Sequence, residues 1–343
     1  MAITLKITTA AKHWIFSLLA WLPLLCLVLW LGSSPHVQES EFPILVAIEQ
    51  AERKPQENPL AASQGSDNAE DTTIEDSATW PASPLAKAPI DGFYQKLDIG
   101  FLPKFNAEGM PAWKAYARPF KQQKNMVGVL VWGLGLDPVI TDKAINHLPP
   151  EIGLVFSPYA ERLQEWIDKA RAVGHEVYIW LPLQPGNYPA TDPGPNALML
   201  DITEKQMQQR LLWILTRAAG YTGLVNGWNM GKNYSNQRLY AIMNALKPHG
   251  LLFIDANPPQ DNTLYQAGKD VGLSMMLVDF QLLGDQGLTV IERGISQIEQ
   301  ETTAGHAVLT TWSSEPAMLK RLQQWVKNAP NLVFAPPSAL YHP

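Results

Sequence analysis

Cysteine is nearly absent from this chain of 343 residues, and charged residues are few. The single cysteine, Cys26, excludes an intrachain disulfide and any metal site built from several thiolates. Charged side chains make up 17% of the residues and the formal net charge is −6, so there is no excess of basic groups. Nucleic-acid recognition depends on such an excess, and the composition does not favour it.

One long apolar run stands near the amino terminus. Residues 14–32 form nineteen positions without a charge, and about 20 apolar residues cross a hydrocarbon core as a helix. Lys6 and Lys12 precede the run, which predicts that residues 1–13 stay in the cytoplasm and that the remainder is exported. A cleavable signal peptide is the alternative, although its apolar core is typically about 7–15 residues long. We therefore expect a single-pass anchor in the cytoplasmic membrane, with Cys26 facing lipid.

The next segment has a different composition. Residues 33–89 are rich in serine, proline, alanine, glutamate and aspartate, and hold little apolar material that could be buried. Such a segment cannot offset the entropy cost of its own ordering, and we expect a flexible acidic tether. It would separate the membrane from one domain at residues 90–343, whose residues 90–120 form a lead-in.

Short apolar runs alternate with amphipathic segments from residue 126 onward. Strands are expected at 126–131, 152–156, 176–181, 223–226, 251–255, 274–280, 307–311 and 332–335, and helices at 160–172, 203–218, 235–246, 263–271, 289–301 and 316–326. The first strand ends in the sequence Trp132-Gly133-Leu134-Gly135, which predicts a loop with glycine hinges. The alternation predicts an α/β fold, a distorted (β/α) barrel of seven or eight parallel strands.

In such a fold the carboxyl ends of the strands share one face, which is where chemistry is usually located. The residues expected on this face as a substrate-binding groove are Trp132, Trp180, Trp228, Asn229, Asp255 and Trp312. Tryptophan offers a flat ring and one N–H donor, which suits contact with sugar rings. The alternative is that these rings only close the mouth of the barrel. His175, His249 and His306 precede strands, so we expect them at the opposite end as turn or surface residues.

Several short segments carry a family resemblance. They are Gly135-Leu136, Ser157-Pro-Tyr-Ala160, Ala172-Val-Gly-His-Glu-Val177, Leu181-Pro-Leu-Gln-Pro185, Asp192-Pro-Gly-Pro195, Asn229-Met-Gly231 and Leu251-Leu-Phe-Ile-Asp255. In this order, over about residues 90–341, the chain resembles the divergent polysaccharide deacetylases. The resemblance implies a distorted (β/α) barrel like that of carbohydrate esterases, and an exported protein acting at the cell envelope.

The resemblance also implies that the usual metal ligands are missing. The aspartate pair of metal-dependent relatives falls on Trp132 and Gly133, and their histidines fall on Trp180, on Asn229 and near Thr311. Only an acidic residue at the end of the fifth strand is retained, as Asp255. A zinc site needs about three oxygen, nitrogen or sulfur ligands from the protein. We therefore expect no metal site and no cofactor.

Three functions remain open on the sequence alone. The preferred hypothesis is a catalytically degenerate envelope protein that binds or scaffolds a polysaccharide such as peptidoglycan. The first alternative is an active deacetylase or hydrolase with an altered site, using Asp255 with Asp279 and Asp137 as ligands or as a general base. These carboxylates could equally be hydrogen-bonded loop anchors. The second alternative is a protein-interaction factor in envelope assembly or division, whose partner no feature of the sequence identifies.

Overall fold

The computed structural model describes residues 80–81, 83–227, 233–257 and 261–342. Its strands are β1 (Tyr94–Leu97), β2 (Gly100–Pro103), β3 (Met126–Leu134), β4 (Gly153–Phe156), β5 (Val177–Leu181), β6 (Gly223–Asn226), β7 (Leu252–Asp255), β8 (Ser274–Leu277), β9 (Phe280–Leu282), β10 (Val308–Ser313) and β11 (Val333–Ala335). Its α-helices are α3 (Ala112–Tyr116), α4 (Pro138–His147), α5 (Leu163–Val173), α6 (Glu204–Leu215), α7 (Asn236–Leu246), α8 (Thr263–Val271), α9 (Leu288–Thr303) and α10 (Pro316–Asn328). Three short 3-10 helices are η1 (Lys247–His249), η2 (Gly284–Gln286) and η3 (Pro337–Leu340).

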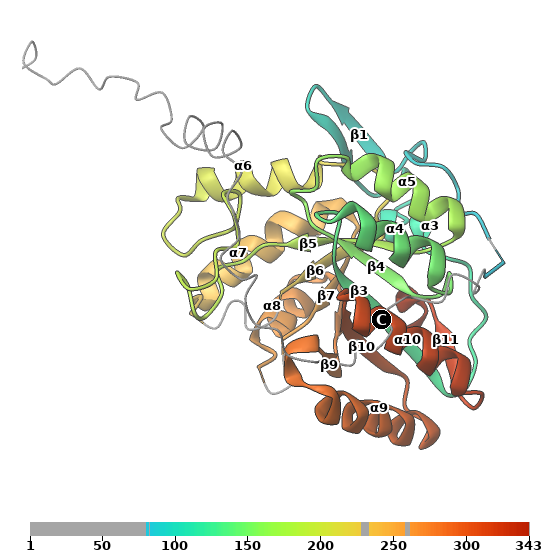
Figure 1. Cartoon of the computed structure of the whole chain (residues 1–343). Helices are drawn as coiled ribbons and strands as arrows, with labels where there is room; N and C mark the ends of the chain where they lie inside the picture. Colours follow the sequence, from blue (N-terminus) through green and yellow to red (C-terminus); the bar gives the residue numbers. More distant parts are fainter. Residues whose placement is uncertain (1–79, 82, 228–232, 258–260, 343) are drawn as a thin grey trace, which may run out of the picture. The chain divides into compact units, whose positions relative to one another are not determined.

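A curled parallel sheet organises these elements, and the helices lie around its outside (Figure 1). The strand order is β8-β7-β6-β5-β4-β3-β10-β9. One edge of β3 pairs with β10. On the other edge, β11 pairs with the start of β3 and β4 pairs with its later part. This arrangement confirms the predicted α/β class and its parallel, curled sheet.

Two residues, Val278 and Asp279, link the two end strands of the curled sheet, and the sequence pattern did not predict this link. Residues 274–280 were expected to form one strand, but β8 and β9 stand at the two ends of the strand order. Between them, the Val278 amide donates to the Asp255 carbonyl (2.9 Å), and the Asp279 amide donates to the Leu309 carbonyl (2.8 Å). The Asp279 carboxylate also accepts the Leu309 amide (2.8 Å). The two linking residues are therefore bonded to β7 on one side and to β10 on the other.

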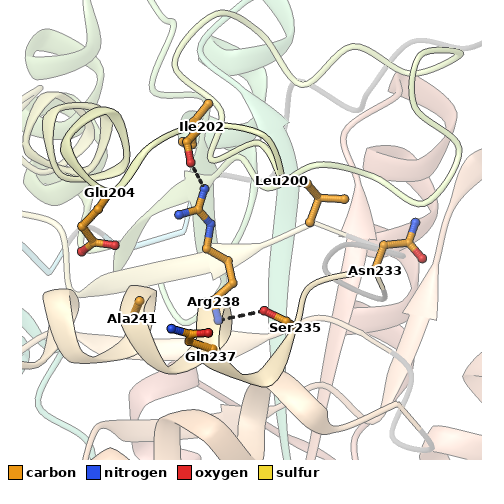
Figure 2. A pocket seen from close by; sticks show the side chains of 8 residues that line it. All are labelled: Leu200, Ile202, Glu204, Asn233, Ser235, Gln237, Arg238 and Ala241. Atoms are coloured by element: carbon orange, nitrogen blue, oxygen red, sulfur yellow. Dashed lines mark hydrogen bonds between the residues drawn. The ribbon is translucent and has the colours of Figure 1, made fainter.

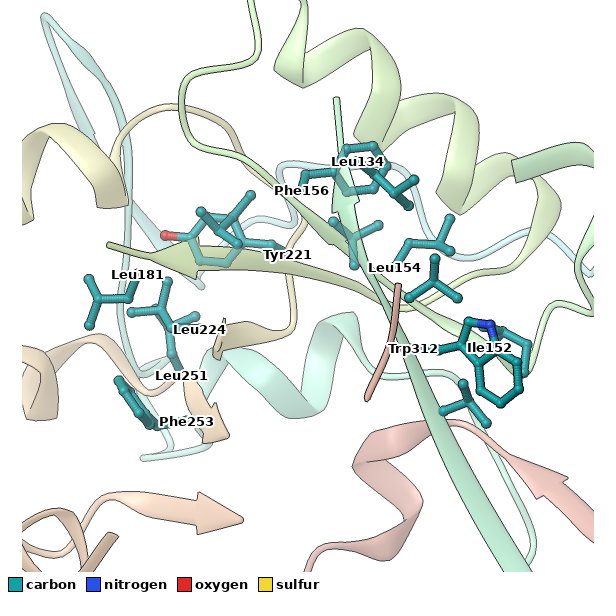
Figure 3. Packing of buried hydrophobic residues seen from close by; sticks show 14 of the residues in the cluster. Leu134, Ile152, Leu154, Phe156, Leu181, Tyr221, Leu224, Leu251, Phe253 and Trp312 are labelled. Carbon is teal, nitrogen blue, oxygen red and sulfur yellow. The ribbon is translucent and has the colours of Figure 1, made fainter. Parts of the chain in front are cut away.

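Two apolar clusters fill the two faces of the sheet, because successive side chains of a strand point to opposite sides. On β3, Val129 and Val131 belong to an outer cluster between the sheet and the helices. Leu130 and Trp132 belong to an inner cluster enclosed by the curl. Figure 3 shows part of the outer cluster. Strands covered on both faces explain why the sequence shows continuous apolar runs rather than alternation.

The amino ends of the strands are closed by the lead-in and by the chain's last residues. The indole of Trp113, on α3, packs edge-on against Tyr341 with ring centroids 5.3 Å apart. Its Nε1 donates to Ser274 Oγ (3.3 Å), and its amide donates to the Gly250 carbonyl (2.9 Å). His175 also lies near this end, but it is fully buried rather than on the surface.

Contacts to the domain begin before the predicted boundary at residue 90. The Ser83 and Leu85 amides donate to the carbonyls of Val173 and Arg171, at the end of α5, at 3.0 and 2.9 Å. The buried guanidinium of Arg171 donates to the carbonyls of Ala86, Tyr116 and Gly220 at 2.8 to 3.0 Å. Because these carbonyls come from three separate segments, Arg171 links the segment around Ala86 to the rest of the domain.

No helix in the described part of the chain is long and apolar enough to span a membrane. The predicted anchor, residues 14–32, and the predicted tether up to residue 79 lie outside the described residues. Their location and role stay predictions.

Candidate functional site

A cavity of about 300 Å³ lies at the carboxyl ends of the strands. It is lined by Trp132, Trp180, Thr191, Gly227, Ala256, Gln281, Leu283 and Thr311. These residues come from the ends of six strands or the loops that follow them, and we call the cavity the mouth pocket. Every lining residue that the structure describes is uncharged, and aromatic and aliphatic side chains provide most of the described surface. Such a composition is typical of a small-molecule binding site.

Two tryptophans form the main wall of the mouth pocket. The rings of Trp132 and Trp180 meet edge to face, with centroids 6.1 Å apart and planes at 65°. The pairing of β3 with β4 is irregular between Val131 and Leu134, and Gly133 has a φ of 89°, which favours glycine. The predicted glycine hinge is thus a bulge inside β3, which continues to Leu134. The bulge turns the strand end where Trp132 stands.

The same tryptophan pair borders a second, smaller cavity. That cavity, of about 110 Å³, is lined by Trp132, Gly133, Leu136, Val155, Phe156, Ser157 and Trp180. Beyond Trp180 the aromatic surface continues: the Tyr159 ring lies 6.2 Å from Trp180 and 5.5 Å from Trp213 on α6. A ligand with more than one ring could therefore contact aromatic surface on either side of the pair.

Gln281 was not among the predicted site residues, although it lines the mouth pocket. It stands at the centre of β9, the short strand that the sequence pattern merged with β8. Its Nε2 donates to the Ala256 carbonyl, and its Oε1 is buried without a hydrogen-bond partner. Trp180 Nε1 is likewise buried and unpartnered. Both atoms have almost no accessible surface, so neither is exposed to the open cavity.

Asp255 ends β7, as predicted, but its carboxylate does not line the mouth pocket. Asp255 is fully buried, and its Oδ1 accepts from Asn226 Nδ2 (2.9 Å) and from the Asn257 amide (3.0 Å). Its Oδ2 accepts from the Tyr265 amide (3.1 Å), in the first turn of α8. Burial raises the pKa of the Asp255 carboxyl, and the hydrogen bonds from Asn257 and Asn226 oppose that rise. This geometry is that of a loop anchor.

Trp312 was predicted in the groove, and the structure places it elsewhere. The ring is fully buried in the outer cluster, stacked on Trp325 of α10 with centroids 5.7 Å apart and planes at 15°. Its Nε1 donates to the Met318 carbonyl (2.8 Å). Strand alternation explains the error, because Thr311 faces the mouth pocket and the next residue must face the helices. Trp228 and Asn229, the remaining predicted groove residues, lie outside the described residues.

The carboxylates of the hydrolase alternative are not gathered at this site. Asp137 is exposed and caps α4, where its Oδ1 accepts the amides of Val139 (2.8 Å) and Ile140 (3.0 Å). Asp279 borders a different cavity, of about 230 Å³, together with Leu309. None of the three carboxylates, counting Asp255, lines the mouth pocket.

Another cavity lies between the segment around residues 200–204 and α7 (Figure 2). Its volume is about 450 Å³, and Arg238 and Glu204 are its charged lining residues. The Arg238 guanidinium donates to the Ile202 carbonyl, and its amide donates to Ser235 Oγ (3.2 Å) at the helix cap. These groups hold the loop against α7. None of the described residues that line this cavity is aromatic, so the mouth pocket is the better candidate for ligand binding.

The donor set of the mouth pocket does not fit a divalent metal. Among the residues that the structure describes, no group of three or more histidine, cysteine, aspartate or glutamate side chains could hold an ion. The oxygen donors of the pocket wall are those of Thr191, Thr311 and Gln281, which are neutral. Such a set falls short of the charged or imidazole ligands that catalytic metal sites use. The side chains of this wall are suited to contacting an organic ligand.

The fold and the pocket define a class of protein, an α/β protein with a curled parallel sheet and a cavity at the carboxyl ends of its strands, where ligands of parallel α/β sheets usually bind. Residues 129–341 match the family model of the divergent polysaccharide deacetylases, and the chain belongs to this family. A search of the curated proteins found no match. A crystal structure of an uncharacterized protein from Agrobacterium tumefaciens C58 is similar, with a TM-score of 0.65 and 29% sequence identity. The match covers 70% of this chain and 99% of that one.

Family membership gives the geometry of the mouth pocket a direct interpretation. Trp132, Trp180 and Thr311 stand where the sequence resemblance places metal ligands of the metal-dependent relatives, and all three line one cavity. Ala256, the neighbour of the retained Asp255, lines it as well. These positions therefore converge in space, and the side chains present there are those of tryptophan and threonine.

Proposed function

We propose that the mouth pocket binds a sugar residue of a cell-envelope polysaccharide, such as peptidoglycan, and that the protein is a glycan-binding or scaffolding module. The observation that carries this proposal is that two tryptophan rings meet in one cavity, at positions where the sequence resemblance places metal ligands. Flat aromatic rings bury the apolar faces of sugars, and their N–H groups bond to hydroxyls. Membership in a family of polysaccharide deacetylases supports a polysaccharide as the ligand class.

The position of the pocket fits a tethered protein. The incoming chain is fastened to the end of α5 by Ser83 and Leu85, which places it near the start of β5. The mouth pocket lies at the other end of the strands. A polysaccharide could therefore reach the pocket without displacing residues 83–85.

Calorimetric titration of the purified full chain with peptidoglycan oligosaccharides tests the proposal. We expect saturable binding that falls at least about tenfold in Trp132→Ala and in Trp180→Ala, since buried aromatic anchors commonly contribute about 2 kcal/mol or more. Phe105→Ala is the matched control: this exposed aromatic lies beside Gly250, at the amino ends of the strands. Absence of binding, or equal affinity in all three variants, would rule out the pocket as the glycan site.

Acetate release from acetylated oligosaccharides should be measured on the same samples. We expect none above the protein-free rate. Turnover that depends on Asp255 would instead support the hydrolase alternative. If neither binding nor turnover occurs, while a defined partner co-purifies from membranes, the protein-interaction alternative is supported.

The cellular location is part of the proposal. Residues 14–32 would anchor the chain in the cytoplasmic membrane and place the folded domain on its outer side. In cells that produce the protein, we expect it in the membrane fraction, and we expect added protease to reach the domain once the outer layers are opened. Amino-terminal sequencing decides between an anchor and a cleaved signal. A mature chain that begins after residue 32 would rule out the anchor.

A further inference from the structure

The loop between β5 and α6 contributes residues to two cavities. Thr191 lines the mouth pocket, and Tyr188, three residues earlier, lines a different cavity of about 530 Å³. We call this second cavity the loop pocket. Its described lining combines apolar residues of the segment 199–202 with aromatic and polar side chains, which are those of Gln184, Tyr188, Asp201, Gln206 and Arg210.

Hydrogen bonds fix the position of this loop. At its base, the Gln184 amide donates to the Tyr234 hydroxyl (2.9 Å), close to the start of α7. At its tip, Asn187 Nδ2 donates to Thr191 Oγ1 (2.9 Å). Three residues extend over at most about 11 Å, so Tyr188 and Thr191 lie within that distance of each other. The two cavities therefore have walls on one short segment, and a chain of sugars held in one could extend to the other.

Two glutamine side chains of the loop pocket are each held by the main chain. Gln184 Oε1 accepts the Leu200 amide (3.1 Å), and Gln206 Oε1 accepts the Thr203 amide (2.8 Å) in the capping box of α6. Since the oxygen of each side-chain amide is engaged, its nitrogen is the group that can donate to a ligand. A side chain that is already oriented loses less conformational entropy when it binds.

Two charged residues and an aromatic ring complete this lining. The Arg210 guanidinium donates to the Ala197 carbonyl and has further N–H groups, while Asp201 is exposed and can accept. The Tyr188 ring is 46% exposed, which leaves an aromatic surface open to a ligand. Sugar hydroxyls both donate and accept, and the apolar face of a sugar packs on an aromatic ring. The loop pocket therefore has the chemistry that suits a sugar.

From these observations we infer that the loop pocket is a second sugar subsite, reached by a glycan that is held in the mouth pocket and continues over the tip of the loop. This inference rests on the proposed function and extends its ligand from one sugar residue to an oligosaccharide chain. Tyr188 supplies the aromatic contact, and Gln206 supplies a hydrogen-bond donor from the first turn of α6.

Calorimetry of the full chain with two lengths of glycan tests the inference. The probes are the disaccharide unit of peptidoglycan, which can occupy one cavity at a time, and an octasaccharide of four such units. A ligand that engages two linked subsites gains affinity from both, so the octasaccharide should bind at least about tenfold more tightly, which is more than its number of repeats alone would give. Equal affinity for both lengths overturns the inference.

Removal of the Tyr188 ring assigns this gain to the loop pocket. Tyr188→Ala should weaken octasaccharide binding at least about fivefold and leave disaccharide binding within about twofold. Phe105→Ala removes a ring of similar exposure, 40% against 46%, at the amino ends of the strands and should leave both affinities unaltered. A loss in Tyr188→Ala that is equal for the two lengths, or no loss at all, contradicts the assignment.

Gln206→Glu examines the hydrogen-bond donor without removing the helix cap. A carboxylate at this position can still accept the Thr203 amide, but the side-chain N–H donors are lost. We expect octasaccharide binding to weaken at least about threefold. Gln208→Glu makes the same charge change two residues further along α6, on another side of the helix, and should leave binding unaltered. An equal loss in both variants would remove Gln206 from the subsite.

Failure of this inference can be distinguished from failure of the proposed function. If neither length of glycan binds, the proposed function fails. If both lengths bind with Trp132 dependence and equal affinity, only the inference fails. A length gain that survives Tyr188→Ala places the second contact elsewhere and also overturns the inference. Should Tyr188→Ala not fold, as shown by circular dichroism, the comparison of lengths on the unmodified chain and Gln206→Glu still decide the outcome.

Discussion

Removal of the Asp255 side chain should destabilise the fold. In Asp255→Ala, three N–H donors, from Asn226, Asn257 and Tyr265, lose their acceptor in a fully buried place. Each buried unsatisfied donor costs about 1–3 kcal/mol, so for three donors we expect a loss of roughly 3–9 kcal/mol in the free energy of unfolding. Asp255→Asn keeps one carbonyl oxygen and places its amide against one donor, which should cost about 1–2 kcal/mol.

The pH dependence of this effect has a definite sign. Burial raises the folded-state pKa of Asp255 above its ordinary value of 3.8, so the unfolded chain loses this proton first as the pH rises. Stability of the unmodified protein should therefore decline between pH 3.8 and the folded-state pKa, relative to Asp255→Asn. Above that window the difference should be constant.

Guanidinium unfolding of the full chain, followed by tryptophan fluorescence, measures these free energies. Asp137→Ala is the control, because this exposed carboxylate also accepts two amide hydrogen bonds but caps a surface helix, where loss costs about 0.5–2 kcal/mol. If Asp255→Ala costs no more than Asp137→Ala, the reasoning that Asp255 is a structural anchor is refuted. A stable Asp255→Asn variant that has lost an acetate-releasing activity would refute it as well.

Three further predictions concern buried residues away from the pocket. Trp312→Ala should cost about 3–5 kcal/mol in unfolding titrations yet leave glycan affinity within twofold, in contrast to Trp180→Ala; a large affinity loss would contradict its outward placement. Arg171→Met should cost about 2–4 kcal/mol and speed hydrogen exchange of residues 83–88, and unchanged exchange would show that the guanidinium does not fasten this segment. Burial lowers the pKa of His175 from 6.5, so the unfolded state takes up the proton first and stability should fall as the pH drops below about 6.5. His175→Gln should make that slope shallower by up to about 1.4 kcal/mol per pH unit, and an unchanged slope in the same titrations would contradict neutral burial.

The repeating pattern of the chain predicted most of the framework. Buried parallel strands read as short apolar runs, and amphipathic helices show a 3.6-residue period, so both are visible in one dimension. The helix expected from residue 203 begins there, where Thr203 and Gln206 form a capping box at the start of α6. The prediction of one strand at 274–280 was wrong, because no local signal marks the break between β8 and β9. The break depends on Asp279, which bonds to Leu309, thirty residues away.

The candidate site was predicted only in part, because the sequence shows where strands end but not which way each side chain faces. Trp132 and Trp180 were placed by their positions at strand ends, and they line the mouth pocket. Trp312 follows the same rule of position but faces outward, since a shift of one residue along a strand reverses the side on which the side chain lies. No local feature of the sequence marks Gln281 as a pocket residue. It lines the pocket because β9 pairs with β10 at the opposite end of the sheet from β8.

The sequence alone therefore determined the family and the α/β class, and it predicted tryptophan and threonine at the positions of the metal ligands, because residue types and their order need no coordinates. Only the tertiary structure decided which faces those residues occupy. It showed that Asp255 is a buried loop anchor, that Trp312 packs against the helices, and that Gln281 lines the same pocket as Trp132 and Trp180. Side-chain direction and hydrogen-bond satisfaction depend on strand register and on contacts between distant segments, which a linear pattern does not contain.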